Sequence, residues 1–151
     1  VSETAIQLGI NIPTGKDSLS MTQKYPNGKV VLSPGTVIIS AVAEVSDVRK
    51  TISPALEPIE NTAILYIDFS SFEKQVGGSS LAQILGQLGN ASPDITDFSY
   101  FKKCFDAVQH AINNEWVYAG HDISSGGLIT SLLEMCFPTP NIGLHITTTE
   151  R

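Results

Sequence analysis

Residues 120–128 (Gly-His-Asp-Ile-Ser-Ser-Gly-Gly-Leu) combine residue types that could bind a metal-bound phosphate. A carboxylate such as Asp122 can hold a divalent cation beside a phosphate. Glycines let a ligand approach the backbone, and Ser124 or Ser125 can cap the helix that follows. The N–H groups at a helix start are unpaired and attract anions. A capped helix after a tight turn, without a ligand, explains these nine residues equally well.

A second polar cluster lies at residues 15–21 (Gly-Lys-Asp-Ser-Leu-Ser-Met). Lys16 could reach a phosphate or a developing negative charge. Its alternative is a solvated loop lysine. The cluster resembles the end of a P-loop, but Ile10 stands where that motif requires its first glycine, so the P-loop interpretation fails.

The elements that must position these clusters follow from hydrophobic periodicity and turn residues. The tight turn 26–28 (Pro-Asn-Gly) predicts a hairpin between residues 20–25 and 29–32. Apolar spacing and capping residues predict helices over residues 2–8, 81–88, 98–112 and 128–136, with one helical turn over 46–50. Apolar, β-branched runs predict strands over residues 36–45, 62–69, 116–119 and 142–147.

Composition limits the classes of function. The 151 residues include 9 basic and 15 acidic side chains, a net charge of −6 that argues against a nucleic-acid-binding surface. No run of 18 apolar residues is present, so we expect no membrane association. Cys104 and Cys136 lie far apart on expected helices, which favours buried thiols in a reducing compartment and a cytoplasmic location. The chain begins without methionine, and we expect it to be part of a longer protein.

Single residues near the first cluster have plain structural interpretations. His121 is the only histidine inside a polar cluster, and a structural role for it is favoured over a catalytic one. Glu134 is most simply an exposed residue of the expected helix over 128–136.

Four motifs together resemble the large phosphoribosylformylglycinamidine synthases. Residues 12–21 match the family pattern IPxGKDSxSM, and residues 45–49 are similar to VxDVR. Residues 77–82 match GGSxLA, and residues 121–128 resemble HDxSDGGL. Each motif alone is weak, but the four occur in the family's order along essentially the whole chain.

This resemblance implies an α+β fold with mixed, largely antiparallel sheets. It places residues 1–56 at the end of an N-terminal subdomain of the aminoimidazole-ribonucleotide-synthetase type. Residues 57–151 then begin the C-terminal α/β subdomain of the same, second synthetase half. The first synthetase half and the glutaminase domain of the family are not matched by this chain.

The resemblance also implies an activity. Family members are ATP-dependent ligases of purine biosynthesis that convert formylglycinamide ribonucleotide, with ammonia from glutamine, into formylglycinamidine ribonucleotide. They use Mg²⁺ and ATP, and the second half holds a tightly bound ADP. We therefore expect the chain to work with the remaining domains of such an enzyme and to be inactive alone. The alternative function is a structural Mg-ADP-binding module without a catalytic role.

Site residues are carried over position by position. Asp122 matches a family metal ligand, and Ser124 matches a nucleotide contact. Asp17 is a further candidate metal ligand. Lys16, Ser18 and Ser20 are candidate phosphate or substrate contacts. No catalytic residue is assigned, and the chain departs from the family pattern at Ser125, where aspartate is common.

A truncated N-terminal subdomain would leave the apolar run 36–45 without neighbours. Exposed apolar strand edges pair with other chains. We therefore expect self-association or disorder within residues 1–56.

Overall fold

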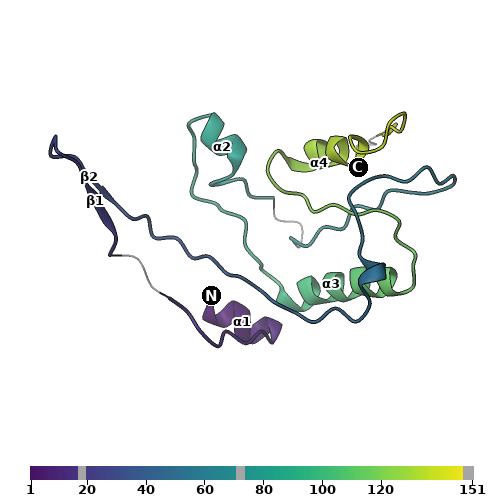
Figure 1. Ribbon diagram of the computed structural model, residues 1–151, viewed down its shortest axis with the longest axis horizontal. Coiled ribbons are helices and arrows are strands. Elements are labelled where there is room, and N and C mark those ends of the chain that lie inside the picture. The colour runs from purple at the N-terminus through teal and green to yellow at the C-terminus, as the bar shows by residue number, and fades with distance from the viewer. Residues whose placement is uncertain (17–19, 71–73, 148–151) are drawn as a thin grey trace. The chain divides into compact units, whose positions relative to one another are not determined.

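The computed structural model describes residues 1–16, 20–70 and 74–147, and divides the chain into two compact units, Val1–Ser46 and Asp47–Arg151. Both helices and a small antiparallel sheet are present, so the fold is α+β as expected. Figure 1 shows the elements in chain order: α1 (Ser2–Leu8), β1 (Thr22–Lys24), β2 (Val30–Leu32), the 3-10 helix η1 (Val48–Lys50), α2 (Ser80–Ile84), α3 (Phe98–Asn113) and α4 (Gly127–Cys136).

The first unit contains α1 and the β1–β2 hairpin, both of which were predicted. α1 ends at Gly9, whose φ of 70° is the left-handed conformation that glycine adopts easily. The hairpin strands are antiparallel, with Gln23 opposite Val31. Its turn is closed by the Gly28 N–H, which donates to the Tyr25 carbonyl at 3.0 Å.

The second unit contains α2, α3 and α4, and two of these helices begin at the predicted kind of cap. The Ser79 hydroxyl accepts a hydrogen bond from the Ala82 N–H at 3.2 Å at the start of α2. The Asp97 carboxylate accepts one from the Tyr100 N–H at 2.9 Å at the start of α3. Each bond satisfies a backbone donor that the helix itself leaves unpaired.

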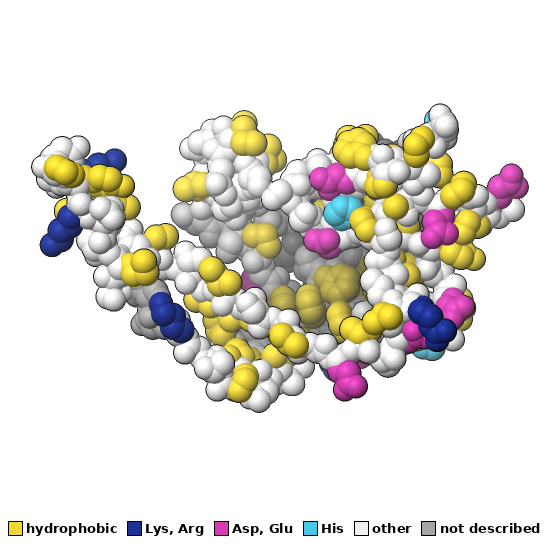
Figure 2. All heavy atoms as spheres, in the orientation of Figure 1, with side chains coloured by type: hydrophobic (Ala, Val, Ile, Leu, Met, Phe, Trp, Pro, Cys, Tyr) yellow, Lys and Arg dark blue, Asp and Glu magenta, His cyan; other side chains and the backbone are white. Residues whose placement is uncertain are grey.

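Few hydrophobic side chains are buried. Within the described residues, only Ala82 and Met135 are buried hydrophobic residues. The apolar stripe of α3 is in part covered, because the ring of Phe101 packs edge-to-face on Phe69 with centroids 5.1 Å apart. Elsewhere many large apolar side chains reach the surface, as the yellow spheres in Figure 2 show. No described helix is both long and apolar enough to cross a bilayer.

The two cysteines differ slightly from expectation. Cys104 and Cys136 are free thiols, as predicted, but they are half-buried rather than fully buried. The pKa of Tyr100 is raised, mainly by a hydrogen bond with Cys104 and to a smaller extent by desolvation. The Tyr100 hydroxyl donates to the Asp68 carbonyl at 2.9 Å. This bond joins the N-terminal end of α3 to a residue 32 positions earlier in the chain.

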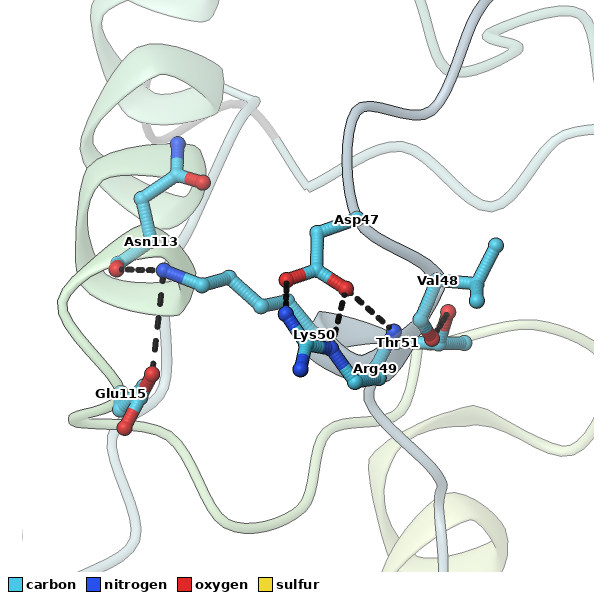
Figure 3. A network of polar contacts seen from close by, with 7 residues as sticks. All are labelled: Asp47, Val48, Arg49, Lys50, Thr51, Asn113 and Glu115. Atoms are coloured by element: carbon cyan, nitrogen blue, oxygen red, sulfur yellow. Dashed lines mark hydrogen bonds and ion pairs between the residues drawn. The ribbon is translucent and has the colours of Figure 1, made fainter.

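Residues 47–56 are held against the helices of the second unit. Figure 3 shows Lys50 at the C-terminal end of α3, where its ammonium donates to the Asn113 carbonyl at 2.7 Å and lies 3.8 Å from Glu115. A cation is favourable there because the last helical carbonyls are unpaired and negative. The Leu56 N–H donates to the Met135 carbonyl at 3.0 Å. We call residues 47–56 the strap.

The four predicted strands at residues 36–45, 62–69, 116–119 and 142–147 are wrong for this structure. In the described residues these segments form no strand. Their apolar side chains are largely exposed, at 84% for Ile38, 99% for Val42 and 82% for Leu65. β-branched residues favour a strand only where a neighbouring strand supplies hydrogen bonds and packing, and here no described segment does so.

Candidate functional site

The turn before α4 has a different cap from the one predicted. Ser124 and Ser125 do not cap the helix, because α4 begins after Gly126 without a side-chain cap hydrogen bond. The turn is closed instead by the Gly127 N–H, which donates to the Ser124 carbonyl at 3.1 Å. The remaining N–H groups of the first helical turn are therefore left for water or an anion.

The two glycines of this turn have different roles. Gly126 has φ 93°, and a Cβ there would collide with the side chain of Thr130. Gly127 also has a left-handed φ, 75°, but a Cβ there would meet no atom within 4 Å. Gly126 is thus required by the turn itself, whereas Gly127 leaves open space beside the backbone, where a ligand could approach.

Asp122 is fixed at its backbone and open at its carboxylate. Its carbonyl oxygen accepts a hydrogen bond from the buried Ser131 hydroxyl at 3.2 Å and lies 2.6 Å from His121 Nδ1. Its side chain is 89% exposed, with Oδ1 3.5 Å from the same ring nitrogen. A carboxylate so held points into solvent next to the uncapped helix start, where a cation and a phosphate could be bound together.

His121 has a partner that sequence reasoning missed. Its Nε2 lies 3.2 Å from the Glu134 carboxylate, and its side chain is only 17% exposed. The structural role expected for His121 is therefore supported, but Glu134 is more than an exposed helix residue. The available signal was weak: Ser131 and Glu134 are three residues apart, which places them on the same side of α4.

The two glycine-serine motifs of the second unit meet. The Ser80 hydroxyl lies 3.4 Å from the Ser125 hydroxyl, although 45 residues separate them in sequence. Ser125, which stands where aspartate is common in the resembled family, thus contacts the start of α2. A pocket of about 280 Å³ lies beside the glycine-serine motif that precedes α2. Gly77, Ala82 and Ala91 are among the residues that line it. A Cβ at Gly77 would come 2.5 Å from the Ala91 carbonyl oxygen. The close approach of the backbone at these two positions therefore requires a glycine.

The loop at residues 15–20 belongs to the first unit and is described only in part. Asp17 and Ser18 lie outside the described residues. Lys16 is exposed, and so is Ser20, whose carbonyl accepts a hydrogen bond from the Thr22 hydroxyl at 3.4 Å. The roles predicted for these four residues stay predictions.

The chemistry of the donor set suits Mg²⁺ bound to a nucleotide better than a metal bound by protein alone. In the described parts of the chain, no three His, Cys, Asp or Glu residues gather as a metal cluster. Mg²⁺ is commonly held by one or two carboxylates together with substrate phosphates and water. One exposed carboxylate, Asp122, beside the uncapped start of α4 fits that arrangement.

Comparison with protein families agrees with the motif resemblance. Residues 1–44 match the FGAR-AT PurM_N-like domain, and residues 64–149 match the C-terminal domain of AIR synthase related proteins. The turn at residues 120–128 and all of α4 lie inside the second match.

Two curated relatives are similar over almost the whole chain. One is a "Probable phosphoribosylformylglycinamidine synthase, chloroplastic/mitochondrial" of Arabidopsis thaliana, 46% identical over 147 residues and covering 97% of this chain. The other is a "Probable phosphoribosylformylglycinamidine synthase" of Caenorhabditis elegans, 43% identical over 151 residues and covering 93% of this chain. The chain spans only 10% and 11% of these relatives, respectively. No solved structure matches the chain. The resemblance predicted from the motifs is confirmed.

Proposed function

Because the chain belongs, over residues 64–149, to the family of AIR synthase related proteins, we propose that it is part of a phosphoribosylformylglycinamidine synthase. The activity proposed for the whole enzyme is conversion of formylglycinamide ribonucleotide, ATP and glutamine-derived ammonia into formylglycinamidine ribonucleotide. ATP phosphorylates the amide oxygen of the substrate, and ammonia then displaces this oxygen, which leaves as inorganic phosphate. The two relatives, which carry this enzyme's name, support the proposal.

Within that enzyme, the turn at residues 120–128 is proposed to hold Mg²⁺ and the phosphates of ADP or ATP. Asp122 is the metal ligand, and Ser124 with the first turn of α4 contacts the nucleotide. The observation that carries this proposal is the exposed Asp122 carboxylate beside a helix start that has no side-chain cap. A bound Mg²⁺ would neutralise phosphate charge there, and the backbone N–H groups would fix the phosphate position.

The loop at residues 15–20 is proposed to line the reaction cleft of the enzyme. Asp17 is the candidate metal ligand, and Lys16, Ser18 and Ser20 are candidate phosphate or substrate contacts. Their residue types support this role, because an ammonium group, hydroxyls and a carboxylate together suit a phosphorylated substrate with its cation. Alanine substitution of Asp17 in the full-length enzyme, read as turnover of formylglycinamide ribonucleotide, tests the assignment.

A structural role for the same nucleotide site is the second candidate function. It is favoured by the way the turn is built into the packing of the second unit. The Gly120 N–H donates to the Ser53 carbonyl of the strap at 3.1 Å, and the buried Ser131 hydroxyl on α4 donates to the Asp122 carbonyl at 3.2 Å. A nucleotide bound there would join the strap to α4 and stabilise the folded state without reacting.

Calorimetric titration with Mg-ADP, comparing the protein with its Asp122→Ala variant, tests nucleotide binding. We expect Asp122→Ala to weaken binding by roughly 10-fold or more, since a direct metal ligand is lost. Equal affinities would contradict the assignment of Asp122. In the full-length enzyme, intact turnover per folded molecule with lower thermal stability would favour the structural role over the catalytic one.

The finer organisation is proposed as well. We place the subdomain boundary at residues 56/57, and limited proteolysis tests it. The rest of the enzyme would complete the mixed, largely antiparallel sheets. The proposed partners are the first synthetase half and the glutaminase domain, and the proposed location is the cytoplasm. The name of the plant relative instead carries "chloroplastic/mitochondrial", so localisation by fluorescent fusion is the direct test.

A further inference from the structure

The ring of His121 is held from two opposite sides. Nε2 lies 3.2 Å from Oε2 of Glu134, and Nδ1 lies 2.6 Å from the carbonyl oxygen of Asp122 and 3.5 Å from its Oδ1. Both ring nitrogens thus face oxygen acceptors, and in either neutral tautomer one ring N–H donates to one of them. The ring is also only 17% exposed, so its rotation is restricted.

Glu134 differs from an ordinary surface carboxylate in what it contacts. It lies on α4, two helical turns beyond Gly127, and its side chain is 44% exposed. A partly exposed polar contact of this kind contributes little to global stability. The contact nevertheless fixes the direction of a ring whose other nitrogen contacts both the carbonyl and the carboxylate of Asp122. Its consequence is therefore expected in the geometry of Asp122 rather than in global stability.

Ser131 provides a second, independent tie from the same helix. Its buried hydroxyl lies 3.2 Å from the Asp122 carbonyl and 3.3 Å from the Gly127 carbonyl. Ser131 and Glu134 therefore both contact the same turn from α4, Ser131 through the Asp122 backbone directly and Glu134 through His121. Together they connect the direction of the Asp122 side chain to the rigid body of α4.

We propose that Glu134 is a positioning residue that, through His121, aims the Asp122 carboxylate at the cation accompanying the bound nucleotide. The proposal rests on the proposed nucleotide site at residues 120–128. Glu134 does not itself touch metal or nucleotide. It restricts the orientations of His121, and His121 restricts those of Asp122. Groups that orient a metal ligand in this way commonly change metal affinity by about 10–100-fold.

The test compares ADP binding with and without Mg²⁺, by calorimetry on the full-length enzyme. The quantity that decides is the gain in ADP affinity that Mg²⁺ provides. Glu134→Ala is expected to reduce this gain by about 10-fold, while ADP binding without Mg²⁺ stays unchanged. Glu134→Gln, which keeps an acceptor oxygen but loses the charge, is expected to fall between Glu134→Ala and the unmodified enzyme. Glu60→Ala is the matched control, since Glu60 is an exposed glutamate outside the turn and α4.

A double-variant comparison separates positioning from loss of folding. If Glu134 acts through His121, the Glu134→Ala/His121→Ala enzyme should lose no more of the Mg²⁺-dependent gain than the worse single variant. Additive losses would overturn the proposed route through His121. Thermal unfolding without nucleotide identifies variants that are merely misfolded, and Glu134→Gln then provides the deciding comparison.

The outcomes distinguish this proposal from the one on which it rests. If Asp122→Ala abolishes the Mg²⁺-dependent gain while Glu134→Ala keeps it, the nucleotide site stands and the positioning role is overturned. If the unmodified enzyme shows no Mg²⁺-dependent gain, or Asp122→Ala leaves it intact, the nucleotide site fails and the positioning role fails with it.

Discussion

Asp122 shows at the scale of one residue how a fixed backbone can present an exposed carboxylate. Its carbonyl oxygen is held from two sides, by Ser131 and His121, while its carboxylate is open to solvent. A ligand group presented from a fixed backbone loses less conformational freedom on binding than one on a mobile loop. The structure therefore favours Asp122 as the first residue to substitute.

Gly126→Ala is expected to destabilise the second unit. A left-handed conformation costs a residue with a Cβ about 1–2 kcal/mol, and the new Cβ would also collide with Thr130. Urea unfolding followed by the emission of Trp116, the one tryptophan of the chain, measures the effect.

Two glycine variants control for the general effect of adding a methyl group. Gly127→Ala should cost less than Gly126→Ala, because its φ is also positive but the space around it is open. Gly143→Ala should be nearly neutral, since neither condition applies there. A Gly126→Ala protein as stable as Gly143→Ala would show that the turn before α4 differs from the one described.

Candidate residues could be found from sequence, but their contacts could not. The composition of residues 120–128 indicates an anion or metal site because aspartate, serine and glycine are the residue types such sites need. The contact between Ser80 and Ser125 joins positions 45 residues apart, and no local pattern encodes it. Likewise, the role of Glu134 depends on the direction in which His121 turns, which only the fold decides.

At the scale of elements, the helices and turns with strong local sequence signals were predicted best. α1, the β1–β2 hairpin, the cap of α3 and the helical turn at η1 depend on contacts within a few residues. α4 was predicted as a helix, but its predicted serine cap was wrong. Gly126, in the left-handed conformation, occupies the N-cap position instead of a serine. The missing strands depend on partners elsewhere, which a local pattern cannot supply.

Asp97→Ala is expected to weaken α3. The Asp97 carboxylate satisfies the Tyr100 N–H at 2.9 Å, and loss of such a cap costs about 1 kcal/mol. Urea unfolding and far-ultraviolet circular dichroism measure the loss. Asp94→Ala is the matched control, because Asp94 accepts a hydrogen bond from the adjacent Ile95 N–H and lies outside the described helices. Equal effects of the two substitutions would contradict the capping role.

The strap is expected to lose a stabilising contact in acid. Arg49 donates side-chain hydrogen bonds of 2.9 and 2.8 Å to the Asp47 carboxylate, and its backbone N–H donates a third at 3.0 Å. These bonds lower the pKa of Asp47 from its ordinary value. Since the folded pKa is the lower one, the stabilisation is fully present above the unfolded pKa and is lost as pH falls through the folded pKa.

Urea unfolding of the protein and of Asp47→Asn across this pH range checks the sign. The difference in free energy of unfolding should be constant from about pH 7 to pH 5 and should shrink toward zero as the pH falls through the folded pKa of Asp47, because the protonated carboxyl and the amide of Asn are both uncharged. A difference that persists at the acid end would assign the effect to something other than the charge of Asp47.

At the scale of the whole molecule, the exposed apolar surface is the dominant property. Val42 is 99% exposed and Ile38 is 84% exposed, and many other large apolar residues share this exposure. Contiguous apolar surface in water either meets a partner or drives aggregation. The proposed remaining domains of the synthase would supply such a partner, which agrees with a chain spanning about a tenth of its relatives.

The chain expressed alone is therefore expected to self-associate through residues 36–45. Val42→Lys should reduce the associated fraction, because burying an unpaired charge in an apolar contact is costly. Light scattering at increasing protein concentration measures this, with Lys24→Met as a control for a change of charge in the same unit. A monomeric unmodified chain in which residues 36–45 are protected from hydrogen exchange would contradict the expectation.

The strap also determines when the second unit can finish folding during synthesis. The Thr139 hydroxyl donates to the Leu56 carbonyl at 2.8 Å across a separation of 83 residues. At a translation rate of about 5–20 residues per second, Leu56 leaves the ribosome roughly 4–17 s before Thr139 does. Until then the strap lacks its contacts with Met135 of α4 and with Thr139. For a nascent chain this is the period in which chaperone binding would compete with misassembly, and slower translation of the α4 region would lengthen it.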